Sequence, residues 1–359
     1  MALPVDRRII LITHLFCAGC VMNTDQRLQQ TINDMVDDRR GILAADESAP
    51  TIKKRFAAIN LESTEATRSS YRSLLLETPG LGEYISGVIL FEETLTQANA
   101  AGTPLPAVAW HQKIVPGIKV DKGTEALAGA PGDLITKGLD GLADRLVTYV
   151  EQGARFAKWR EVYPITDINP TPLGLHANAE RLAHYAKTCQ ELGVVPIVEP
   201  EVLMDGNHDI ARCAVVTEQV LHAVFNVLLR YGVTLEHMIL KPNMVLPGKD
   251  CRIAPPEEIA EATLNIFRRT IPAAVPSINF LSGGQTPEEA TANLNAINQI
   301  GGPWQLSISY GRALQQPVLQ AWQGKAENIS AAQAALLKRA RLNSLARLGK
   351  YAAVMETKA

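Results

Sequence analysis

The pattern of apolar and polar positions from residue 40 onward alternates between short runs rich in β-branched residues and longer stretches with helical periodicity. Eight of the short runs have the length and composition of strands. They lie at residues 42–46, 87–92, 115–120, 156–162, 194–202, 237–245, 277–284 and 306–311. Strands that alternate with helices are typical of α/β folds with a parallel sheet.

The helical stretches between these runs have recognisable ends. The segment TPEE at residues 286–289 is a capping box with proline at the first helical position, so a helix should begin there. Gly193 and Gly232 follow two other helical stretches and are expected to end them in the left-handed conformation. From Ser330 the capping pattern recurs with Gln333, which predicts a further helix with an apolar face.

Eight strand-helix units predict an α/β fold, namely a single-domain (β/α)8 or TIM barrel over residues 22–351, followed by a short tail at residues 352–359. A doubly wound sheet is the alternative, but it would more often carry a glycine-rich nucleotide turn after its first strand. No proline-rich or serine-rich linker divides the chain, which agrees with one domain.

Composition and charge narrow the class of partner. Apolar residues make up 47% of the chain, charged residues make up 20%, and the net charge is -2. We therefore expect no nucleic-acid or membrane partner, and anions must bind at a local cationic site. The five scattered cysteines are too few for a disulfide framework, so a cytoplasmic location is expected. Cys17 and Cys20 have no second pair at zinc-finger spacing.

Residues 1–21 form a leader of doubtful status. An apolar run over residues 9–21 follows two arginines and resembles a signal peptide, and residues 18–20 resemble a lipoprotein cleavage site. The run is too short for a transmembrane helix. We favour a start at Met22, because Asn23 or Thr24 is a good helix cap and an amphipathic stripe follows at Leu28, Ile32, Met35 and Val36.

Charged residues gather at the ends of the predicted strands. In a (β/α)8 barrel the C-terminal ends of all strands open at one mouth, where the chemistry takes place. Any one such residue can be a solvated rim charge, but random charges need not gather at the same end of five of the first six strands. The sequence therefore predicts one shared site that includes Asp46, Lys119, Lys158, Arg160, Glu199, Glu201 and Lys241.

Lys241 is the most unusual of these residues, because it interrupts the apolar run HMILKPNMV. An amine in apolar surroundings and near a second cation such as Lys158 has its neutral form favoured, and a neutral amine attacks carbonyl carbons. The expected product is a Schiff base, which withdraws electrons and lets a nearby carbon-carbon bond break. Glu199, Glu201 and Asp46 are placed to transfer the protons. The proline after Lys241 is expected to end the strand.

The last two predicted strands end in LSGGQ and SYGR. Ser282, Gly283 and Gly284 lead into the helix expected after residue 286, so backbone N-H groups and a positive helix end should meet there. Gly311 and Arg312 add a close backbone approach and a guanidinium. Phosphate sites after strands seven and eight are common in this architecture, so we predict an anion site.

Eight motifs carry a family resemblance. GILAADES, GVILFEETL, GIKVDKG, FAKWR, VPIVEPE, LKPNMV, FLSGGQ and SYGRALQ occur in this order and together resemble class I fructose-bisphosphate aldolase. The resemblance implies a cytoplasmic lyase of glycolysis and gluconeogenesis that needs no metal and no other cofactor. It also implies reversible cleavage of fructose 1,6-bisphosphate into dihydroxyacetone phosphate and glyceraldehyde 3-phosphate through a lysine Schiff base, in a homotetramer.

The resemblance assigns roles residue by residue. Lys241 matches the Schiff-base lysine and Glu199 matches the principal acid-base residue. Asp46, Lys158 and Glu201 resemble the residues that support carbinolamine chemistry and bind substrate hydroxyls. The site of one phosphate matches Arg55, Ser282, Gly283, Gly284, Ser309, Gly311 and Arg312, and the region of the second phosphate matches Lys119, Arg160, Ser48 and Arg68.

The chain departs from the family pattern in two places. Ala49-Pro50-Thr51 stands where a small pair often precedes a serine, so we expect Thr51 to supply the hydroxyl and Pro50 to stiffen a loop. Many animal and plant members end in a tyrosine that helps proton exchange on the enamine, whereas this sequence ends at Ala359 and Tyr351 is badly placed to replace it. Slow enamine protonation, with accumulation of the dihydroxyacetone phosphate adduct, is the expected consequence.

Three other interpretations stay open. A non-catalytic scaffold is disfavoured by the intact strand-end residues, and a Schiff-base aldolase for a monophosphate is disfavoured by the second set of cations. An exported lipoprotein rests on residues 1–22 alone. A metal site is not expected, because His176 and His184, the closest pair that a helix could align, would lie roughly 12 Å apart along its axis. The sequence leaves the preference between fructose 1,6-bisphosphate and fructose 1-phosphate open.

Overall fold

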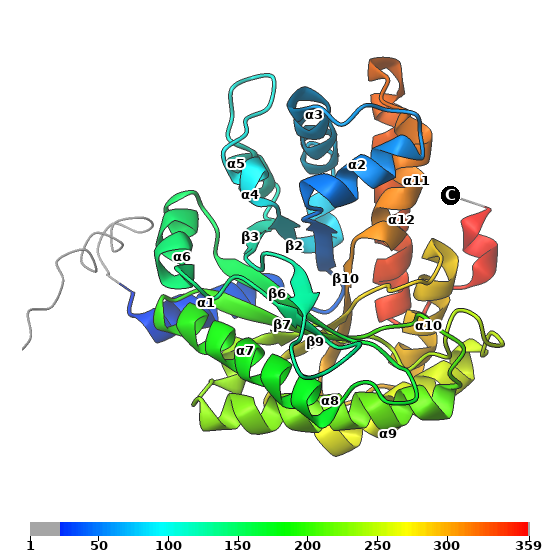
Figure 1. The fold of residues 1–359 in the computed structure, drawn as a ribbon. Helices are drawn as coiled ribbons and strands as arrows, with labels where there is room; N and C mark the ends of the chain where they lie inside the picture. The colour runs from blue at the N-terminus through cyan, green and yellow to red at the C-terminus, as the bar shows by residue number, and fades with distance from the viewer. Residues whose placement is uncertain (1–21, 358–359) are drawn as a thin grey trace, which may run out of the picture.

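The computed structural model describes residues 22–357 and contains a closed barrel of eight parallel strands surrounded by helices (Figure 1). The strands follow one another around the barrel in the order β1-β10-β9-β8-β7-β6-β3-β2. Their bounds are β1 Gly41–Ala45, β2 Ile85–Leu90, β3 Val115–Lys119, β6 Phe156–Tyr163, β7 Val195–Val202, β8 Ile239–Leu240, β9 Ser277–Phe280 and β10 Gln305–Tyr310. All eight predicted strands and the (β/α)8 fold are thereby confirmed. The leader, with Cys17 and Cys20, lies outside the described residues.

Twelve α-helices lie in the described part of the chain, with a small antiparallel hairpin of β4 Thr124–Ala126 and β5 Leu134–Thr136. Helices α7, α8 and α9 cover one side of the barrel (Figure 1). The helices are α1 Thr24–Met35, α2 Ala49–Ala57, α3 Glu65–Leu76, α4 Glu92–Leu95, α5 Leu105–His111, α6 Leu142–Glu151, α7 Pro172–Glu191, α8 Ile210–Arg230, α9 Pro256–Thr270, α10 Pro287–Ile300, α11 Arg312–Trp322 and α12 Ile329–Arg347.

The helix ends agree with the sequence at four places and differ at one. Asn23 caps α1 and Thr286 caps α10, each through a complete capping box. Gly193 and Gly232 follow α7 and α8 with φ of 71° and 64°. The predicted cap at Ser330 is wrong, because α12 begins at Ile329 after the short turn η4 Ala326–Asn328 and its N-cap position makes no side-chain hydrogen bond.

The sixth and seventh strands, β8 and β9, are shorter than predicted. β9 ends at Phe280 rather than residue 284. β8 ends at Leu240 rather than residue 245, and His237 belongs to the turn η3 Leu235–His237. Pro242 has no N-H group for the sheet, so the ladder cannot continue past Lys241, whose own N-H still donates to the Val198 carbonyl at 2.8 Å. The expectation that Pro242 ends the strand is confirmed.

The interior of the barrel changes from apolar to charged along the strands. Its N-terminal layer is a buried cluster to which α1 contributes, so α1 covers that end of the barrel. Because side chains along a strand alternate between its two faces, every second residue points into the barrel. The inward position after Phe156 is Lys158, and the inward position after Ile239 is Lys241. The buried cluster comprises Leu28, Ile32, Met35, Ile42, Ala44, Ile89, Val115, Phe156, Val195, Ile197 and Ile239.

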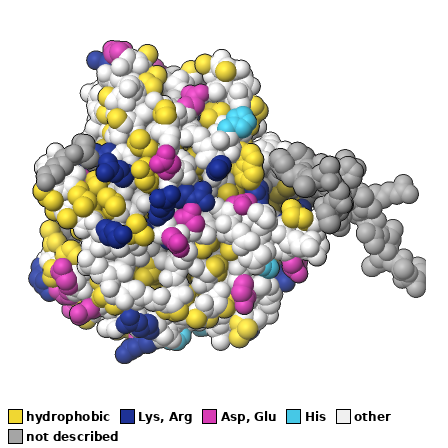
Figure 2. Space-filling model, turned by 180° about the vertical axis from the view of Figure 1, so that it is seen from behind, with side chains coloured by type: hydrophobic (Ala, Val, Ile, Leu, Met, Phe, Trp, Pro, Cys, Tyr) yellow, Lys and Arg dark blue, Asp and Glu magenta, His cyan; other side chains and the backbone are white. Residues whose placement is uncertain are grey.

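The outer surface shows no large area of one charge on the face drawn in Figure 2, where Lys and Arg side chains lie among Asp and Glu side chains. Within residues 22–357 one helix, α8, is long and apolar enough to cross a membrane by length and composition alone. Half of its most apolar stretch is buried in the fold, including Val216, Val220 and Val224. Packing against the barrel and its neighbouring helices accounts for that apolar character.

Candidate active site

Six charged side chains form a connected group at the C-terminal mouth of the barrel, called the ion-pair cluster below. Lys158 Nζ lies 2.8 Å from Asp46 Oδ2, 3.3 Å from Glu199 Oε2 and 3.8 Å from Asp121 Oδ2. Glu199 Oε1 lies 3.2 Å from Lys241 Nζ. The cluster is completed by Lys119, whose ammonium group donates to Asp121. Three cations thus face three carboxylates.

Strand register explains why these residues meet although they are far apart in the sequence. β3 and β6 pair Lys119 with Lys158, and β6 and β7 pair Arg160 with Glu199. Side chains that alternate along neighbouring parallel strands point to the same face of the sheet, here the interior of the barrel. The register therefore brings the cations and carboxylates of separate strands into contact.

The electrostatic surroundings keep Lys158 and Asp46 charged. Burial alone would lower the pKa of the Lys158 amine, but the carboxylates of Asp46, Glu199 and Asp121 outweigh it and raise that pKa above its ordinary value. Burial would also raise the pKa of the Asp46 carboxyl, but the charges of Lys158 and Lys241 hold it below its ordinary value. Lys158 is therefore a permanent cation at neutral pH.

Lys241 differs from Lys158 in the number of its partners. Both side chains are only about 4% exposed. Lys158 has three carboxylates within 4 Å, whereas Lys241 has one among the described residues, Glu199. Glu199 Oε2 makes no hydrogen bond within residues 22–357, although it lies in a buried site. That oxygen can accept a proton or a hydrogen bond from a bound molecule.

The second pair of predicted residues lies beside the cluster. Arg160 Nε donates to Glu201 Oε2, and the Arg160 side chain is 40% exposed at the mouth. Burial lowers the pKa of the Arg160 guanidinium, but Glu201 outweighs it and the net shift is upward. Arg160 is therefore a fixed cation that a second anionic group of a ligand could approach.

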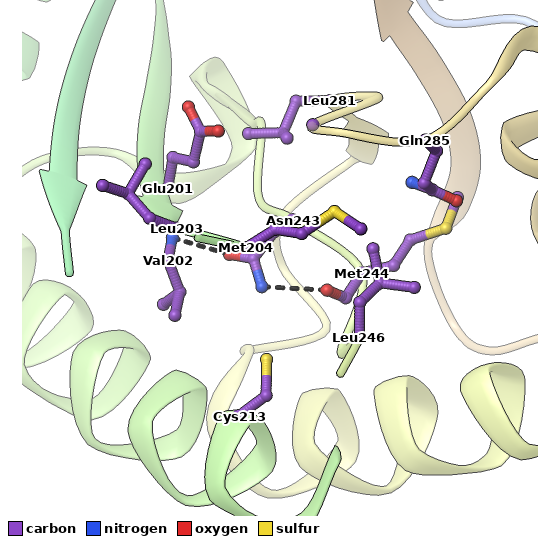
Figure 3. Close-up of a pocket in the computed structure, with 11 residues that line it drawn as sticks. Glu201, Val202, Leu203, Met204, Cys213, Asn243, Met244, Leu246, Leu281 and Gln285 are labelled. Carbon is purple, nitrogen blue, oxygen red and sulfur yellow. Dashed lines mark hydrogen bonds between the residues drawn. The ribbon is translucent and has the colours of Figure 1, made fainter. Parts of the chain in front are cut away.

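Asn243 holds the segment after Lys241 in place. Its Oδ1 accepts from the Val202 N-H at 2.9 Å, and its Nδ2 donates to the Met244 carbonyl at 3.0 Å, as the dashed lines in Figure 3 show. These residues and Glu201 line a cavity of about 10 Å³, which has room for about one water molecule. The segment that carries Lys241 is thus tied to the end of β7.

The predicted anion-binding residues also lie close to one another. Arg312 Nη2 donates to the Gly283 carbonyl, which joins the loops after β9 and β10. Arg55 also lies close, because a Cβ on Gly311 would be 3.8 Å from Arg55 Nη2, an ordinary van der Waals distance. Ser309 is 1% exposed and its hydroxyl has no hydrogen-bond partner among the described residues. Arg55, Ser309 and Arg312 therefore bring hydrogen-bond donors from separate segments to the loops after β9 and β10.

Glu47 orients the Arg55 side chain. Its carboxylate accepts from Arg55 Nη1 and from Gln315 Nε2 at 2.7 Å, and its Oε2 forms an ion pair with Arg72 Nη2 at 2.6 Å. These contacts tie the end of β1 to helices α2, α3 and α11. The motif GILAADES contains Glu47, but the sequence offered no sign that its partners would be two arginines from different helices.

Two residues predicted for the second phosphate do not join the ion-pair cluster in the described part of the chain. Arg68 on α3 donates to both carboxylate oxygens of Glu93, at 2.8 and 2.5 Å. Ser48 lies 3.2 Å from the Thr51 hydroxyl. Pro50 does not stiffen a loop as expected, because Ala49–Ala57 is helix α2 and Pro50 occupies its first turn, where proline is tolerated.

Asp121 and Asn243 are site residues that sequence reasoning missed. Asp121 follows β3 directly and contacts both Lys119 and Lys158. An Asp after a strand is usually read as a turn residue. The sequence feature that could have revealed Asp121 is its position in GIKVDKG, two residues after the strand-end charge of Lys119. For Asn243 the signal was an amide inside a run of buried residues.

Known proteins similar to this chain share one activity. The chain is 57% identical over 315 residues to cytosolic fructose-bisphosphate aldolase 4 of Arabidopsis thaliana, which covers 87% of this chain and 80% of that protein. It is 51% identical over 329 residues to a probable fructose-bisphosphate aldolase class 1 of Xylella fastidiosa, which covers 91% of this chain and 98% of that protein. Several plant relatives are named cytosolic or cytoplasmic isozymes, which agrees with the cytoplasmic location expected from the cysteines.

The fold agrees with a solved structure as well. Fructose-bisphosphate aldolase from Plasmodium falciparum, crystallised with TRAP and a small-molecule inhibitor, superposes with a TM-score of 0.90 at 51% identity. The match covers 92% of this chain and 96% of that chain. The sequence pattern of the family described as fructose-bisphosphate aldolase class-I matches residues 27–359. The chain therefore belongs to the class I fructose-bisphosphate aldolase family.

Proposed function

We propose that this chain cleaves fructose 1,6-bisphosphate with Lys241 as the amine that forms the Schiff base. Class I aldolases perform this cleavage through a lysine Schiff base and without a metal. The observation that supports the assignment is the position of Glu199, whose two oxygens lie 3.2 Å from Lys241 Nζ and 3.3 Å from Lys158 Nζ. A carboxylate between a reactive amine and a fixed cation can take and return protons at the reacting centre.

The proposed reaction begins at C2 of the substrate. Lys241 passes a proton to Glu199, and its neutral amine attacks the C2 carbonyl. Glu199 returns that proton to the carbinolamine hydroxyl, which leaves as water, and a protonated Schiff base remains. Lys158, held as a cation by its three carboxylates, donates a hydrogen bond to the oxygen at C2 while that oxygen carries developing negative charge. Asp46 and Glu201 orient Lys158 and Arg160 through their ion pairs.

Bond cleavage follows at C3 and C4. Glu199 accepts the proton of the C4 hydroxyl, the C3-C4 bond breaks, and its electron pair moves into the iminium group to give an enamine. Glyceraldehyde 3-phosphate leaves. The enamine is protonated at C3, and water hydrolyses the Schiff base to release dihydroxyacetone phosphate and regenerate the Lys241 amine. In the reverse direction the same enamine attacks the aldehyde.

The two substrate phosphates would occupy separate cationic regions. One fits the loops of Ser282, Gly283, Gly284, Ser309, Gly311 and Arg312 with Arg55, where the free Ser309 hydroxyl and the start of α10 offer donors. The other fits Lys119 and Arg160, with Ser48 at the edge; Arg68 could contribute only by leaving Glu93. We also propose a homotetramer, on the basis of the family.

Borohydride trapping tests the assignment of Lys241. We expect reduction in the presence of dihydroxyacetone phosphate to label Lys241, identified by peptide mass analysis, and Lys241→Met to abolish both labelling and cleavage. Lys325→Met, which removes an exposed lysine, is the matched control and should behave as the wild type. Glu199→Gln should lower kcat by roughly 10²- to 10⁴-fold and still allow labelling. A label on Lys158 instead would refute the mechanism.

A further inference from the structure

A C-terminal segment beyond α12 is held on the body of the protein through Glu356. This residue ends the short helix η5 Ala353–Glu356, which lies beside α12 (Figure 1, red). Its carboxylate accepts from Arg339 Nη1 at 2.6 and 2.7 Å and from the Tyr351 hydroxyl at 2.9 Å. Its backbone carbonyl accepts from Lys338 Nζ at 2.6 Å. The ion pair of this attachment joins the Glu356 carboxylate to the Arg339 guanidinium.

Arg339 makes a second set of contacts, with the first turn of α10. Its Nη2 donates to the Pro287 carbonyl at 2.7 Å and to the Thr291 hydroxyl. The Arg339 residue is 2% exposed. A buried guanidinium is strongly unfavourable without a carboxylate partner, and Glu288, the other carboxylate near it, lies 3.8 Å away with its side chain 57% exposed. Glu356 is therefore the main countercharge of Arg339.

The first turns of α10 hold the loop that carries Ser282, Gly283 and Gly284. Asn293 Nδ2 donates to Gln285 Oε1 at 2.7 Å, and Gln285 Nε2 donates to the Ser282 carbonyl at 3.1 Å. Both amide side chains are buried. Gln285 also donates its backbone N-H to the Ser282 carbonyl at 3.0 Å. A shift of α10 would therefore move the Ser282 end of the loop.

A cavity of about 460 Å³ lies between the C-terminal segment and this loop. Tyr351 and Ala353 of the C-terminal segment line it, and so do Gly284 and Gln285 of the loop. The hydrogen-bonded route passes from Glu356 through Arg339 to the start of α10 and on to the loop.

We propose that Arg339 and Glu356 are a positioning pair that sets the orientation of the α10 start and, through it, the phosphate-binding geometry of residues 282–284. The inference rests on the proposed function, because it assumes that this loop binds a substrate phosphate. Neither residue contacts the ion-pair cluster in the described part of the chain. The pair should therefore affect phosphate binding and leave the chemistry at Lys241 nearly unchanged.

Variants of Glu356 test the positioning pair by separating binding from turnover. We expect Glu356→Ala to raise KM for fructose 1,6-bisphosphate and the inhibition constant of inorganic phosphate by the same factor, roughly threefold to tenfold, with kcat within twofold of the wild type. Hydrogen exchange should become faster over residues 282–291. Glu356→Asp keeps the charge and should restore part of the affinity. Val354→Ala, in the same turn with Val354 55% exposed, is the matched control and should change none of these quantities.

The outcomes separate the two proposals. If the wild type neither cleaves the bisphosphate nor traps dihydroxyacetone phosphate on Lys241, the proposed function fails. If the wild type does both, unchanged KM and phosphate inhibition in Glu356→Ala would refute the positioning pair alone, as would faster exchange confined to residues 353–357. A fall in kcat and thermal stability at constant KM would show a merely structural role. Glu356→Gln, which keeps the size of the side chain, replaces Glu356→Ala if the latter does not fold.

Discussion

The carboxyl groups of Asp46 and Glu161 illustrate how the surroundings of an acidic side chain decide whether it is charged. Asp46 faces Lys158 and Lys241, and the pKa of its carboxyl lies below the ordinary value even though burial alone would raise it. Glu161 lies on the outer side of β6 and is fully buried, its Oε1 accepts from Trp159 Nε1 at 2.7 Å, and its Oε2 makes no hydrogen bond within residues 22–357. Burial raises the pKa of Glu161 from 4.5 to about 8.

The raised pKa of Glu161 predicts that stability falls as the pH rises. Between its unfolded value of 4.5 and its folded value of about 8, the folded state keeps a proton that the unfolded state releases. The free energy of unfolding should therefore decrease across this window, by on the order of 5 kcal/mol at most, and change no further above it. Urea unfolding at a series of pH values measures the slope.

Glu161→Gln should flatten that slope and stabilise the protein at pH 9, because the amide carries no charge to bury. Glu327→Gln is the control, since Glu327 is exposed on the short turn η4. An equally steep loss of stability in Glu161→Gln would show that other groups cause it. The seven histidines are the other side chains with ordinary pKa values in this range.

Residue identity and spacing were enough to predict much of the site, but not which of its side chains would contact one another. Lys158, Glu199 and Lys241 were recognisable because a period of two and an apolar strand point charged residues to one mouth. Asp121 was missed because its contacts with Lys119 and Lys158 depend on the register of β3 with β6, which the sequence pattern does not specify. The Arg68 contact with Glu93 depends on how α3 packs beside α4, which the pattern does not specify either.

At the scale of elements, the strands were predictable because each is a short apolar run between helix signals. Errors occurred where one residue changes the local geometry. Pro242 ends β8 after two residues, and the chain between Leu281 and Thr286 turns away from the barrel to form the loop before α10. Ser330 carries a capping pattern, yet α12 follows directly after the turn at residues 326–328, and its N-cap is Asn328, two residues earlier than predicted.

The helix α1 gives an element-scale prediction. Ile32 is 4% exposed and belongs to the apolar cluster that closes the N-terminal end of the barrel. Ile32→Ala should lower the free energy of unfolding by about 2–5 kcal/mol, because it removes buried methylene groups and leaves a cavity. The effect on KM should be small, since the substrate site is at the opposite end of the strands.

Gln30→Ala on the exposed side of the same helix is the control for Ile32→Ala and should alter stability by less than about 0.5 kcal/mol. Urea unfolding followed by tryptophan fluorescence measures both variants. Equal stability of Ile32→Ala and the wild type would mean that α1 is not part of the cooperative core. A large rise in KM for Ile32→Ala would contradict the separation of the two ends of the barrel.

At the scale of the whole molecule, charge and apolar surface are distributed unevenly. The net charge is only -2, yet the mouth of the barrel collects Lys119, Lys158, Arg160 and Lys241 in one place. This local arrangement allows a bisphosphate to bind without a generally basic surface. The outer helices instead expose large apolar side chains, which include Leu173 on α7 and Val215 and Leu229 on α8.

The exposed apolar side chains of α7 and α8 predict where subunits meet in the proposed homotetramer. Leu229 is 77% exposed, and contact with another subunit would remove it from water. The wild type should have about four times the 39.0 kDa mass of one chain in light scattering, and Leu229→Lys should shift the distribution towards smaller species.

Ile300→Lys, at a side chain 45% exposed on α10, is the control and should leave the mass unchanged. Turnover per chain should stay within twofold, because the residues of the ion-pair cluster all come from one chain. A Leu229→Lys protein of unchanged mass would exclude this contact, and a monomeric wild type would exclude the tetramer itself.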